Sequence, residues 1–314
     1  MSIEIYAHRG GGGYFVENTL PAFINAVRLG CEGAELDVHL SADGEVMVHH
    51  NPTLNYCYTR GSDGSWLKRE ERLEIGQLSA AELATYKTGL PNPDSGYPAD
   101  FNLVRSDLES TIPRLDEVIS EVQSLSKNFR LVIELKADIF ATDIDKREKL
   151  CRRVLEVIEA TGFRRRALVC GFDWRLLRHM RELAPGLETW FTTQPMSWWF
   201  GEQVPASDLS PSYSYVAKLR ALLSESNAQW FDGFQPDAPG ALAEKIAQAG
   251  GDAWFCYYTD CTRKTVESAR KAGIKLYAWS VNVRDPDVAQ RLEDIGVDGY
   301  CTDYPFFGVN APEG

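Results

Sequence analysis

Three acidic residues lie in two strand-like segments, at positions that would bring their side chains together. Glu35 and Asp37 are two residues apart in one segment, and Glu134 precedes Lys136 by two residues in a later one. Because side chains alternate between the two faces of a strand, the members of each pair share a face. Three converging carboxylates without a cysteine ligand predict a site for one divalent cation, Mg²⁺ or Ca²⁺. The alternative is a buried ion pair between Glu134 and Lys136 beside a solvated strand end.

Histidines follow two of the predicted strands. His8 comes directly after residues 3–7, and the pair His49 and His50 ends the segment 46–50. Adjacent strand residues point to opposite faces, so only one of that pair can face the same side as His8. Active sites of parallel barrels are built at the carboxyl ends of the strands. We therefore expect His8 and one of the paired histidines to lie near the carboxylates.

Two further residues at strand ends have both a functional and a structural interpretation. Asp303 follows the predicted strand 299–302, where it is either an acid behind the site or a turn-forming residue. Trp279 shares a strand face with Tyr277, which makes it either a pocket wall or part of the core.

Short apolar runs alternate with longer amphipathic runs along most of the chain. This pattern is typical of βαβ units. Strands are predicted at residues 3–7, 33–38, 46–50, 130–136, 167–170, 188–192, 233–235, 253–257, 275–281 and 299–302. Helices are predicted at residues 18–29, 115–125, 149–161, 174–183, 239–249, 262–272 and 286–295.

The number and order of these elements favour a single TIM (β/α)₈ barrel spanning residues 1–314. No Gly-x-Gly-x-x-Gly opens a helix after the first strand, which argues against a dinucleotide-binding fold. Residues 51–112 contain no clear strand–helix unit apart from a modest helical segment at 79–87, and they are rich in turn residues. Long irregular segments in compact domains tend to be lids or binding elements. We therefore expect this insertion of about 60 residues to cap the active-site face.

Composition restricts the partners and the location. The formal net charge of −12 argues against a nucleic-acid partner. No apolar run is long enough to span a bilayer, and no secretory leader is recognisable, so we expect no stable membrane insertion and a soluble, cytoplasmic protein. The seven cysteines include no C-x-x-C pair, which argues against a zinc ribbon and agrees with a reducing compartment. The sequence does not indicate an oligomeric state.

An ordered set of short motifs resembles the glycerophosphodiester phosphodiesterase family. No single motif is specific, but their order is preserved from residue 3 to residue 305. The matching segments are His8-Arg9-Gly10, Glu17-Asn18-Thr19, Glu35-Leu36-Asp37, Val48-His49-His50, Ile112-Pro113-Arg114-Leu115-Asp116-Glu117-Val118-Ile119, Glu134-Leu135-Lys136, Trp279-Ser280-Val281-Asn282 and Thr302-Asp303-Tyr304-Pro305.

The resemblance implies a TIM barrel with an insertion after the second catalytic histidine, and it implies roles for the residues. The divalent metal would be held by Glu35, Asp37 and Glu134. His8 and His50 would form the acid–base pair, with His49 as the fallback for His50. Phosphate would bind to Arg9 and Lys136, and Trp279 would contact the substrate.

The sequence departs from the family pattern at two positions. Asn51 follows His50 where the family usually has aspartate, and Asn51 still offers an acceptor to the imidazole. The proline that the family has before Glu17 is Val16 here, a change that we take as neutral.

The implied reaction is metal-dependent hydrolysis of a glycerophosphodiester, a small-molecule substrate, to sn-glycerol 3-phosphate and an alcohol. One alternative is a lysophospholipase D or sphingomyelinase D-like activity on lipids, in which the aromatic stretch Met196-Ser197-Trp198-Trp199-Phe200 would form an acyl-chain lip. The favoured interpretation of this stretch is that it packs against the insertion. A less favoured alternative is a Schiff-base aldolase that uses Lys136. A third is a silent barrel that only binds phosphodiesters.

Overall fold

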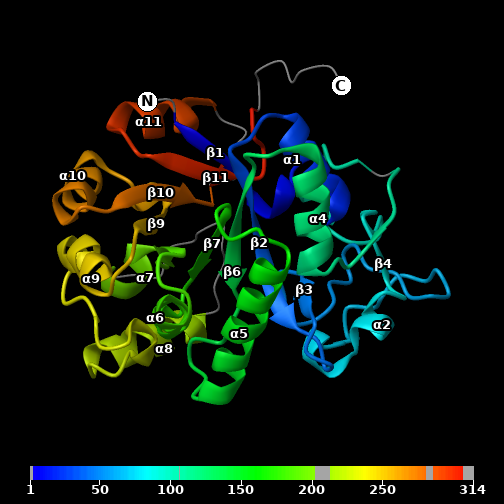
Figure 1. The fold of residues 1–314 in the computed structure, drawn as a ribbon, viewed down its shortest axis with the longest axis horizontal. Coiled ribbons are helices and arrows are strands. Elements are labelled where there is room, and N and C mark those ends of the chain that lie inside the picture. Colours follow the sequence, from blue (N-terminus) through cyan, green and yellow to red (C-terminus); the bar gives the residue numbers. More distant parts are fainter. Residues whose placement is uncertain (1–2, 106, 202–212, 281–285, 307–314) are drawn as a thin grey trace.

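A closed barrel of eight parallel strands forms the centre of the molecule (Figure 1). The structure is a computed structural model that describes residues 3–105, 107–201, 213–280 and 286–306. The strands follow one another round the barrel in sequence order, and pairing of the first with both the second and the last closes it. They are β1 (Glu4–Ala7), β2 (Gly33–Leu40), β6 (Arg130–Leu135), β7 (Ala167–Gly171), β8 (Glu188–Thr192), β9 (Ala253–Tyr257), β10 (Lys275–Trp279) and β11 (Gly299–Thr302). The TIM-barrel prediction is confirmed.

Amphipathic helices cover the outside of the barrel between consecutive strands. They are α1 (Leu20–Arg28), α4 (Leu115–Leu125), α5 (Ile144–Ala160), α6 (Trp174–Leu183), α9 (Leu242–Gln248), α10 (Arg263–Ala272) and α11 (Pro286–Ile295). Helix α5 begins five residues earlier than predicted, because Asp143 caps its amino end by accepting a hydrogen bond from the Lys146 amide.

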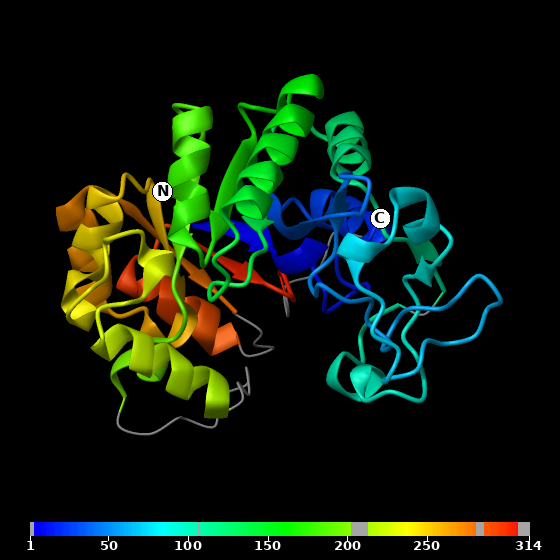
Figure 2. The same cartoon turned by 90° about the horizontal axis from the view of Figure 1, so that it is seen from below.

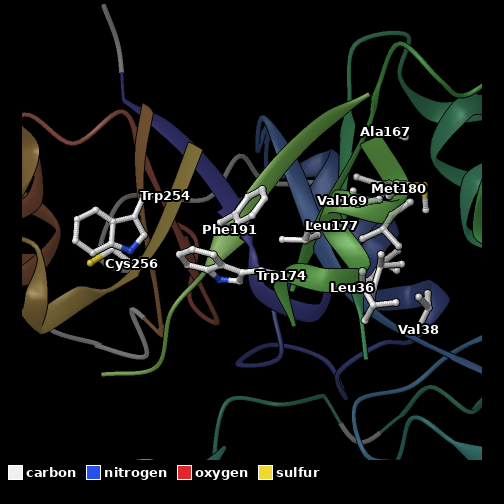
Figure 3. Close-up of a cluster of buried hydrophobic side chains, with 14 of the residues drawn as sticks. Leu36, Val38, Ala167, Val169, Trp174, Leu177, Met180, Phe191, Trp254 and Cys256 are labelled. Carbon is white, nitrogen blue, oxygen red and sulfur yellow. The ribbon is translucent and has the colours of Figure 1, made fainter. Parts of the chain in front are cut away.

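Strand alternation divides the apolar side chains between two layers. Leu36 and Val38 of β2 point outward and join the cluster between strands and helices, which Figure 3 shows together with Trp174, Leu177 and Phe191. A second cluster fills the barrel interior and consists of Tyr6, Val132, Leu168, Cys170, Trp190, Ala253, Phe255, Tyr277 and Cys301. On β2 and β6, the inward-facing positions nearer the carboxyl ends carry the polar residues Glu35, Asp37 and Glu134.

Two predicted strands are not barrel strands. The segment predicted at 46–50 forms β3 (Val46–Val48), which turns back and pairs antiparallel with the end of β2. Residues 233–235 form no strand, because β8 pairs directly with β9 and leaves no place between them. The predicted strand 275–281 ends at Trp279, and Val281 lies outside the described residues.

Two long connections lie on opposite flanks of the barrel (Figure 2). The insertion at 51–112 contains α2 (Ala80–Leu83), α3 (Tyr97–Asp100) and the small sheet of β4 (Lys87–Thr88) and β5 (Ser110–Thr111). It packs around its own apolar cluster of Met47, Leu54, Leu67, Ile75, Leu83 and Ile112. On the other flank, the β8–β9 connection carries α7 (Met196–Phe200) and α8 (Tyr213–Ser224), which the sequence interpretation missed.

Among the residues that the structure describes, no helix combines the length and the apolar character needed to cross a membrane. The seven cysteines are all free thiols.

Candidate active site

A cavity of about 550 Å³ opens at the carboxyl ends of the barrel strands. Its walls differ in character. Charged residues from β1, β2, β6 and the segment after β3 form one part, and aromatic residues form another. The lining residues are His8, Arg9, Glu35, His50, Glu134, Leu135, Lys136, Ala137, Asp138, Ile139, Phe172, Thr192, Gln194, Trp198, Tyr215, Phe255 and Trp279. The cavity thus combines a polar site with an adjoining apolar surface.

The three predicted carboxylates converge in this cavity. Glu35, Asp37 and Glu134 each offer an oxygen, and these oxygens lie within 4.8 Å of one another. Parallel pairing of β2 with β6 sets Asp37 directly beside Glu134, and strand alternation sets Glu35 on the same inward face. The first two side chains are almost fully buried. The sequence therefore identified the residues that meet here.

The chemistry of this donor set fits a hard divalent cation. All three groups are oxygen ligands, which Mg²⁺ and Ca²⁺ prefer. Burial and the neighbouring Asp37 charge raise the pKa of Glu35 to about 8, because two carboxylates in one buried site repel each other. The Asp37 Oδ1 atom is buried and accepts no hydrogen bond. A bound cation would relieve both conditions.

Two cations flank the carboxylate cluster. The Lys136 Nζ atom donates a 3.0 Å hydrogen bond to Glu134 Oε1 and lies 3.4 Å from Asp37 Oδ1. Burial lowers the pKa of Lys136, but the Glu134 and Asp37 charges outweigh it and raise the pKa above its usual value. A Schiff-base lysine needs a lowered pKa, so this environment argues against the aldolase alternative.

Arg9 occupies a strained turn directly after β1. Its φ is 51°, and Gly10 and Gly11 that follow also have positive φ. A Cβ atom on Gly10 would lie 2.8 Å from the Ala22 Cβ of α1, so only glycine fits there. The turn aims the Arg9 amide at Glu35 Oε2, at 3.0 Å, and puts the guanidinium Nε 3.3 Å from Asp37 Oδ2.

His8 is held by an acid from the last strand. Its Nδ1 atom donates a 2.7 Å hydrogen bond to Asp303 Oδ1, and its Nε2 atom lies 3.9 Å from Glu35 Oε2. Burial lowers the pKa of His8, but the Asp303 charge and hydrogen bond outweigh it, so the pKa lies above its usual value. Asp303 was interpreted either as an acid behind the site or as a turn-forming residue. Its hydrogen bond to His8 agrees with the first interpretation.

The two paired histidines have different surroundings. His50 lines the cavity, and its Nδ1 atom donates a 3.0 Å hydrogen bond to Asn51 Oδ1. Burial and the Arg9 and Lys136 charges hold the pKa of His50 well below its usual value. His49 is buried away from the cavity lining, where its Nδ1 donates to the Asn51 carbonyl. His50 reaches the cavity from the segment after the antiparallel strand β3, not from a barrel strand.

Two residues that contact the site, Asn18 and His39, were given no role in the sequence analysis. Asn18, in a left-handed conformation with φ 56°, donates a 2.8 Å hydrogen bond to Asp37 Oδ2. His39 continues the Glu35–Asp37 alternation on β2, and its Nε2 donates to the His50 carbonyl. That period-two spacing was a usable signal for His39. Asn18 is directed at Asp37 by a turn, and a turn has no regular spacing of residues that could be recognised in the sequence.

The aromatic wall includes two predicted residues. Trp279 lines the cavity and donates a 3.1 Å hydrogen bond to the Thr193 carbonyl, with its ring 5.4 Å from that of Phe172. Trp198 of α7 also lines it, whereas Trp199 is buried against Phe231 and Phe200 is partly exposed. Only one residue of the predicted aromatic lip therefore reaches the cavity lining.

Comparison with known proteins adds three findings. The sequence model of the Glycerophosphoryl diester phosphodiesterase family matches residues 8–306. The glycerophosphodiester phosphodiesterase of Caldanaerobacter subterraneus is 26% identical over 313 residues, which cover 99% of this chain and 98% of that protein. A Silicibacter pomeroyi protein whose crystal structure carries the same family description is 28% identical, with a TM-score of 0.79 over 96% of this chain and 90% of that one.

The same architecture recurs at lower identity. A phosphodiesterase of Oleispira antarctica, solved in complex with the product sn-glycerol-3-phosphate, is 20% identical with a TM-score of 0.64. The alignment covers 96% of this chain and 93% of that chain.

Proposed function

The chain belongs to the glycerophosphoryl diester phosphodiesterase family and is an enzyme that hydrolyses glycerophosphodiesters; on that premise, we propose how its residues perform the reaction. The products are sn-glycerol 3-phosphate and an alcohol. We assign one divalent cation, Mg²⁺ or Ca²⁺, to Glu35, Asp37 and Glu134. The observation that carries this assignment is the convergence of three carboxylate oxygens in a cavity that His8 and His50 also line.

The proposed phosphate site combines the bound cation with the side chains of Arg9 and Lys136. When bound, the cation supplies positive charge to the phosphoryl oxygens. Arg9 and Lys136 line the same cavity and bind the phosphate beside it. Their own carboxylate partners hold both side chains in place before substrate arrives, which reduces the entropy lost on binding.

His8 acts as the base and His50 as the acid. Because Asp303 accepts the Nδ1 proton of His8, the lone pair of neutral His8 lies on Nε2, the atom that faces Glu35. That nitrogen takes the proton of the nucleophile, which is water or the 2-hydroxyl of the glycerol moiety. The 2-hydroxyl route first gives a cyclic phosphate, and a water molecule then opens the ring by cleaving the bond between phosphorus and the 2-oxygen, which gives sn-glycerol 3-phosphate. His50 then protonates the leaving alkoxide.

The aromatic wall and the insertion are assigned to substrate selection. Trp198, Phe172, Tyr215, Phe255 and Trp279 provide apolar surface next to the phosphate site. This apolar surface could also hold the acyl chain of a lysophospholipid. It therefore favours one alternative function, a lysophospholipase D activity. We propose that the insertion at 51–112 caps the active-site face, and that the enzyme acts in the cytoplasm, where seven free thiols would stay reduced.

The test is an assay of purified enzyme with glycerophosphocholine and lysophosphatidylcholine. We expect faster release of choline from glycerophosphocholine, complete loss on chelation with EDTA, and recovery when Mg²⁺ or Ca²⁺ is restored. His8→Ala should lower kcat about 10²–10⁴-fold. His179→Ala, which removes a partly buried histidine of α6 that is not among the cavity-lining residues, is the control and should keep full activity.

Full activity in EDTA or in the His8→Ala variant would overturn the mechanism. Faster turnover of lysophosphatidylcholine would transfer the assignment to the lipid alternative. Binding of glycerophosphocholine without hydrolysis would support the silent barrel.

A further inference from the structure

A tyrosine from the insertion reaches the charged side of the site without lining the cavity. Tyr58 is 2% exposed, and its hydroxyl donates a 2.8 Å hydrogen bond to Glu17 Oε1. Its ring packs with Val16 and Tyr97, and the two tyrosine ring centres lie 5.5 Å apart. The hydroxyl is therefore held in place by an apolar cluster formed by both the insertion and the chain before α1.

Glu17 connects this tyrosine to Arg9. Its second oxygen, Oε2, accepts a 2.7 Å hydrogen bond from Arg9 Nη1. Arg9 is held on another side by Asp37, whose Oδ2 lies 3.3 Å from the guanidinium Nε. Each oxygen of the Glu17 carboxylate thus has its own donor, and two donors on separate oxygens fix the plane of the carboxylate. The plane of the carboxylate in turn fixes the direction of the guanidinium.

We propose that Tyr58 is a positioning residue for substrate phosphate, acting on Arg9 through Glu17. The inference rests on the proposed role of Arg9 in phosphate binding. Loss of the Tyr58 hydroxyl frees Glu17 Oε1 to rotate or to recruit water, and Arg9 then loses a fixed partner. A guanidinium recognises phosphate through directional paired hydrogen bonds, so a misdirected Arg9 binds phosphate less well. The insertion thereby contributes to substrate affinity through a residue that does not touch the substrate.

The chain offers a matched pair of variants. Tyr58→Phe removes the hydroxyl that binds Glu17, and Tyr97→Phe removes a hydroxyl in the same cluster that makes no side-chain hydrogen bond. For Tyr58→Phe we expect KM for glycerophosphocholine to rise about tenfold while kcat stays within about twofold, the pattern of lost binding shared by ground state and transition state. Inhibition by inorganic phosphate should weaken by a similar factor. Tyr97→Phe should change neither value.

A double-mutant cycle tests the route through Glu17. In a Glu17→Gln background, Tyr58→Phe should add less than about a twofold further rise in KM, because the acceptor that it served has changed. An unchanged KM in Tyr58→Phe, equal effects of the two tyrosine variants, or additive effects with Glu17→Gln would each overturn the proposal. If Tyr58→Phe does not fold, Glu17→Gln alone tests the same link, and an unchanged phosphate affinity then contradicts it.

Failure of the proposed function would be visible separately. If the wild-type enzyme hydrolyses no phosphodiester, calorimetric binding of inorganic phosphate to the wild-type and Tyr58→Phe proteins still measures the effect on Arg9. Weaker phosphate binding by the variant would support the inference, and equal binding would overturn it.

Discussion

His8 and His50 each give their Nδ1 proton to an acceptor, but the two acceptors carry different charges. Asp303 accepts from His8 at 2.7 Å, and the neutral amide of Asn51 accepts from His50 at 3.0 Å. A carboxylate stabilises the charged imidazolium, and an amide does so much less. Although burial lowers the pKa of His8, the Asp303 charge and hydrogen bond keep it above the ordinary histidine value. Burial and the Arg9 and Lys136 charges hold the pKa of His50 below that value. Taken alone, this difference keeps the proton on His8 and leaves His50 unprotonated, which favours the exchange of the two proposed roles. The two variants that follow decide between the assignments.

Replacement of Asp303 by asparagine should change the acidic side of the pH profile. Asp303 raises the pKa of His8, so Asp303→Asn lowers it. A base acts in its unprotonated form, and the acidic limb of kcat/KM should therefore move to lower pH. The measurement is the pH dependence of glycerophosphocholine hydrolysis. If the alkaline limb moves instead, His8 is the acid and the two roles are exchanged.

Replacement of Asn51 by aspartate should change the alkaline limb of the pH profile of activity. A carboxylate next to His50 Nδ1 raises the pKa of this imidazole, whose present value is held down by burial and by the Arg9 and Lys136 charges. An acid must carry its proton, so Asn51→Asp should extend activity to higher pH. Asn55→Asp alters another asparagine of the insertion and serves as the control. An alkaline limb that does not move would contradict the acid role of His50.

At the scale of elements, β2 contributes more site residues than any other strand described here. Glu35, Asp37 and His39 alternate on its inward face, and Leu36 and Val38 pack outward against the helices. The strand thus joins the helical layer to the proposed cation site, and its pairing with β6 brings Glu134 beside Asp37. Substitutions on the outward face of β2 should therefore lower the stability of the fold, whereas substitutions on its inward face should lower the affinity for the cation.

Glu35→Gln should weaken cation binding. It removes one charged oxygen ligand of three, and we expect at least about a 100-fold loss of affinity, since even residues that only support ligands contribute 10–100-fold. Calorimetric titration with Mg²⁺ and with Ca²⁺ measures the loss and identifies the preferred ion. Glu32→Gln, an exposed carboxylate just before β2, is the control. Equal affinity in wild type and Glu35→Gln would place the cation elsewhere.

Several barrel strands and covering helices begin and end at the residues that the sequence predicts. Strands β8 and β9 have the predicted bounds, as do helices α4 and α6. The strand predicted at 46–50 is confirmed over Val46–Val48, but its antiparallel pairing with β2 was not predicted, because an antiparallel edge strand has the same local pattern as a barrel strand. Direction of pairing depends on the fold, not on local alternation. Residues 233–235 were misassigned for a similar reason, since β9 already occupies the place beside β8.

The candidate site was predictable where its residues follow strands and less so elsewhere. Glu35, Asp37, Glu134 and His8 follow from alternation and from the common edge of a parallel sheet. Tyr58 and Asn18 could not be placed in this way, because a turn or an irregular insertion brings each of them to the site. The local sequence of a turn or an irregular insertion carries little information about which part of the fold its side chains will contact.

At the scale of the whole molecule, the barrel interior below the site is filled by a buried layer rich in aromatic side chains. Trp190 and Tyr277 stack with ring centres 3.9 Å apart, and Tyr6 meets Trp190 edge-on at 5.2 Å. The polar tips have partners: the Trp190 indole donates to Glu188 and the Tyr277 hydroxyl donates to Glu4. The layer supports the inward residues above it, since the same strands contribute to both.

Trp190→Ala should destabilise the fold without altering the site directly. The side chain is fully buried, and removing it should lower the free energy of unfolding by about 3–5 kcal/mol, measured by urea denaturation. Trp66→Ala, in the insertion and only partly buried against Arg60, should cost about 1 kcal/mol. A loss below about 1 kcal/mol in Trp190→Ala would mean that the interior layer contributes little to stability.

The hydrogen bond between His8 and Asp303 joins residues 295 positions apart, which directly follow the first and last strands of the barrel. A chain still being synthesised contains the three carboxylates of the proposed cation site, Arg9 and His8 long before Asp303 has been translated. Hydrolysis by the complete His8–Asp303 pair therefore cannot begin on a ribosome-bound fragment that lacks β11.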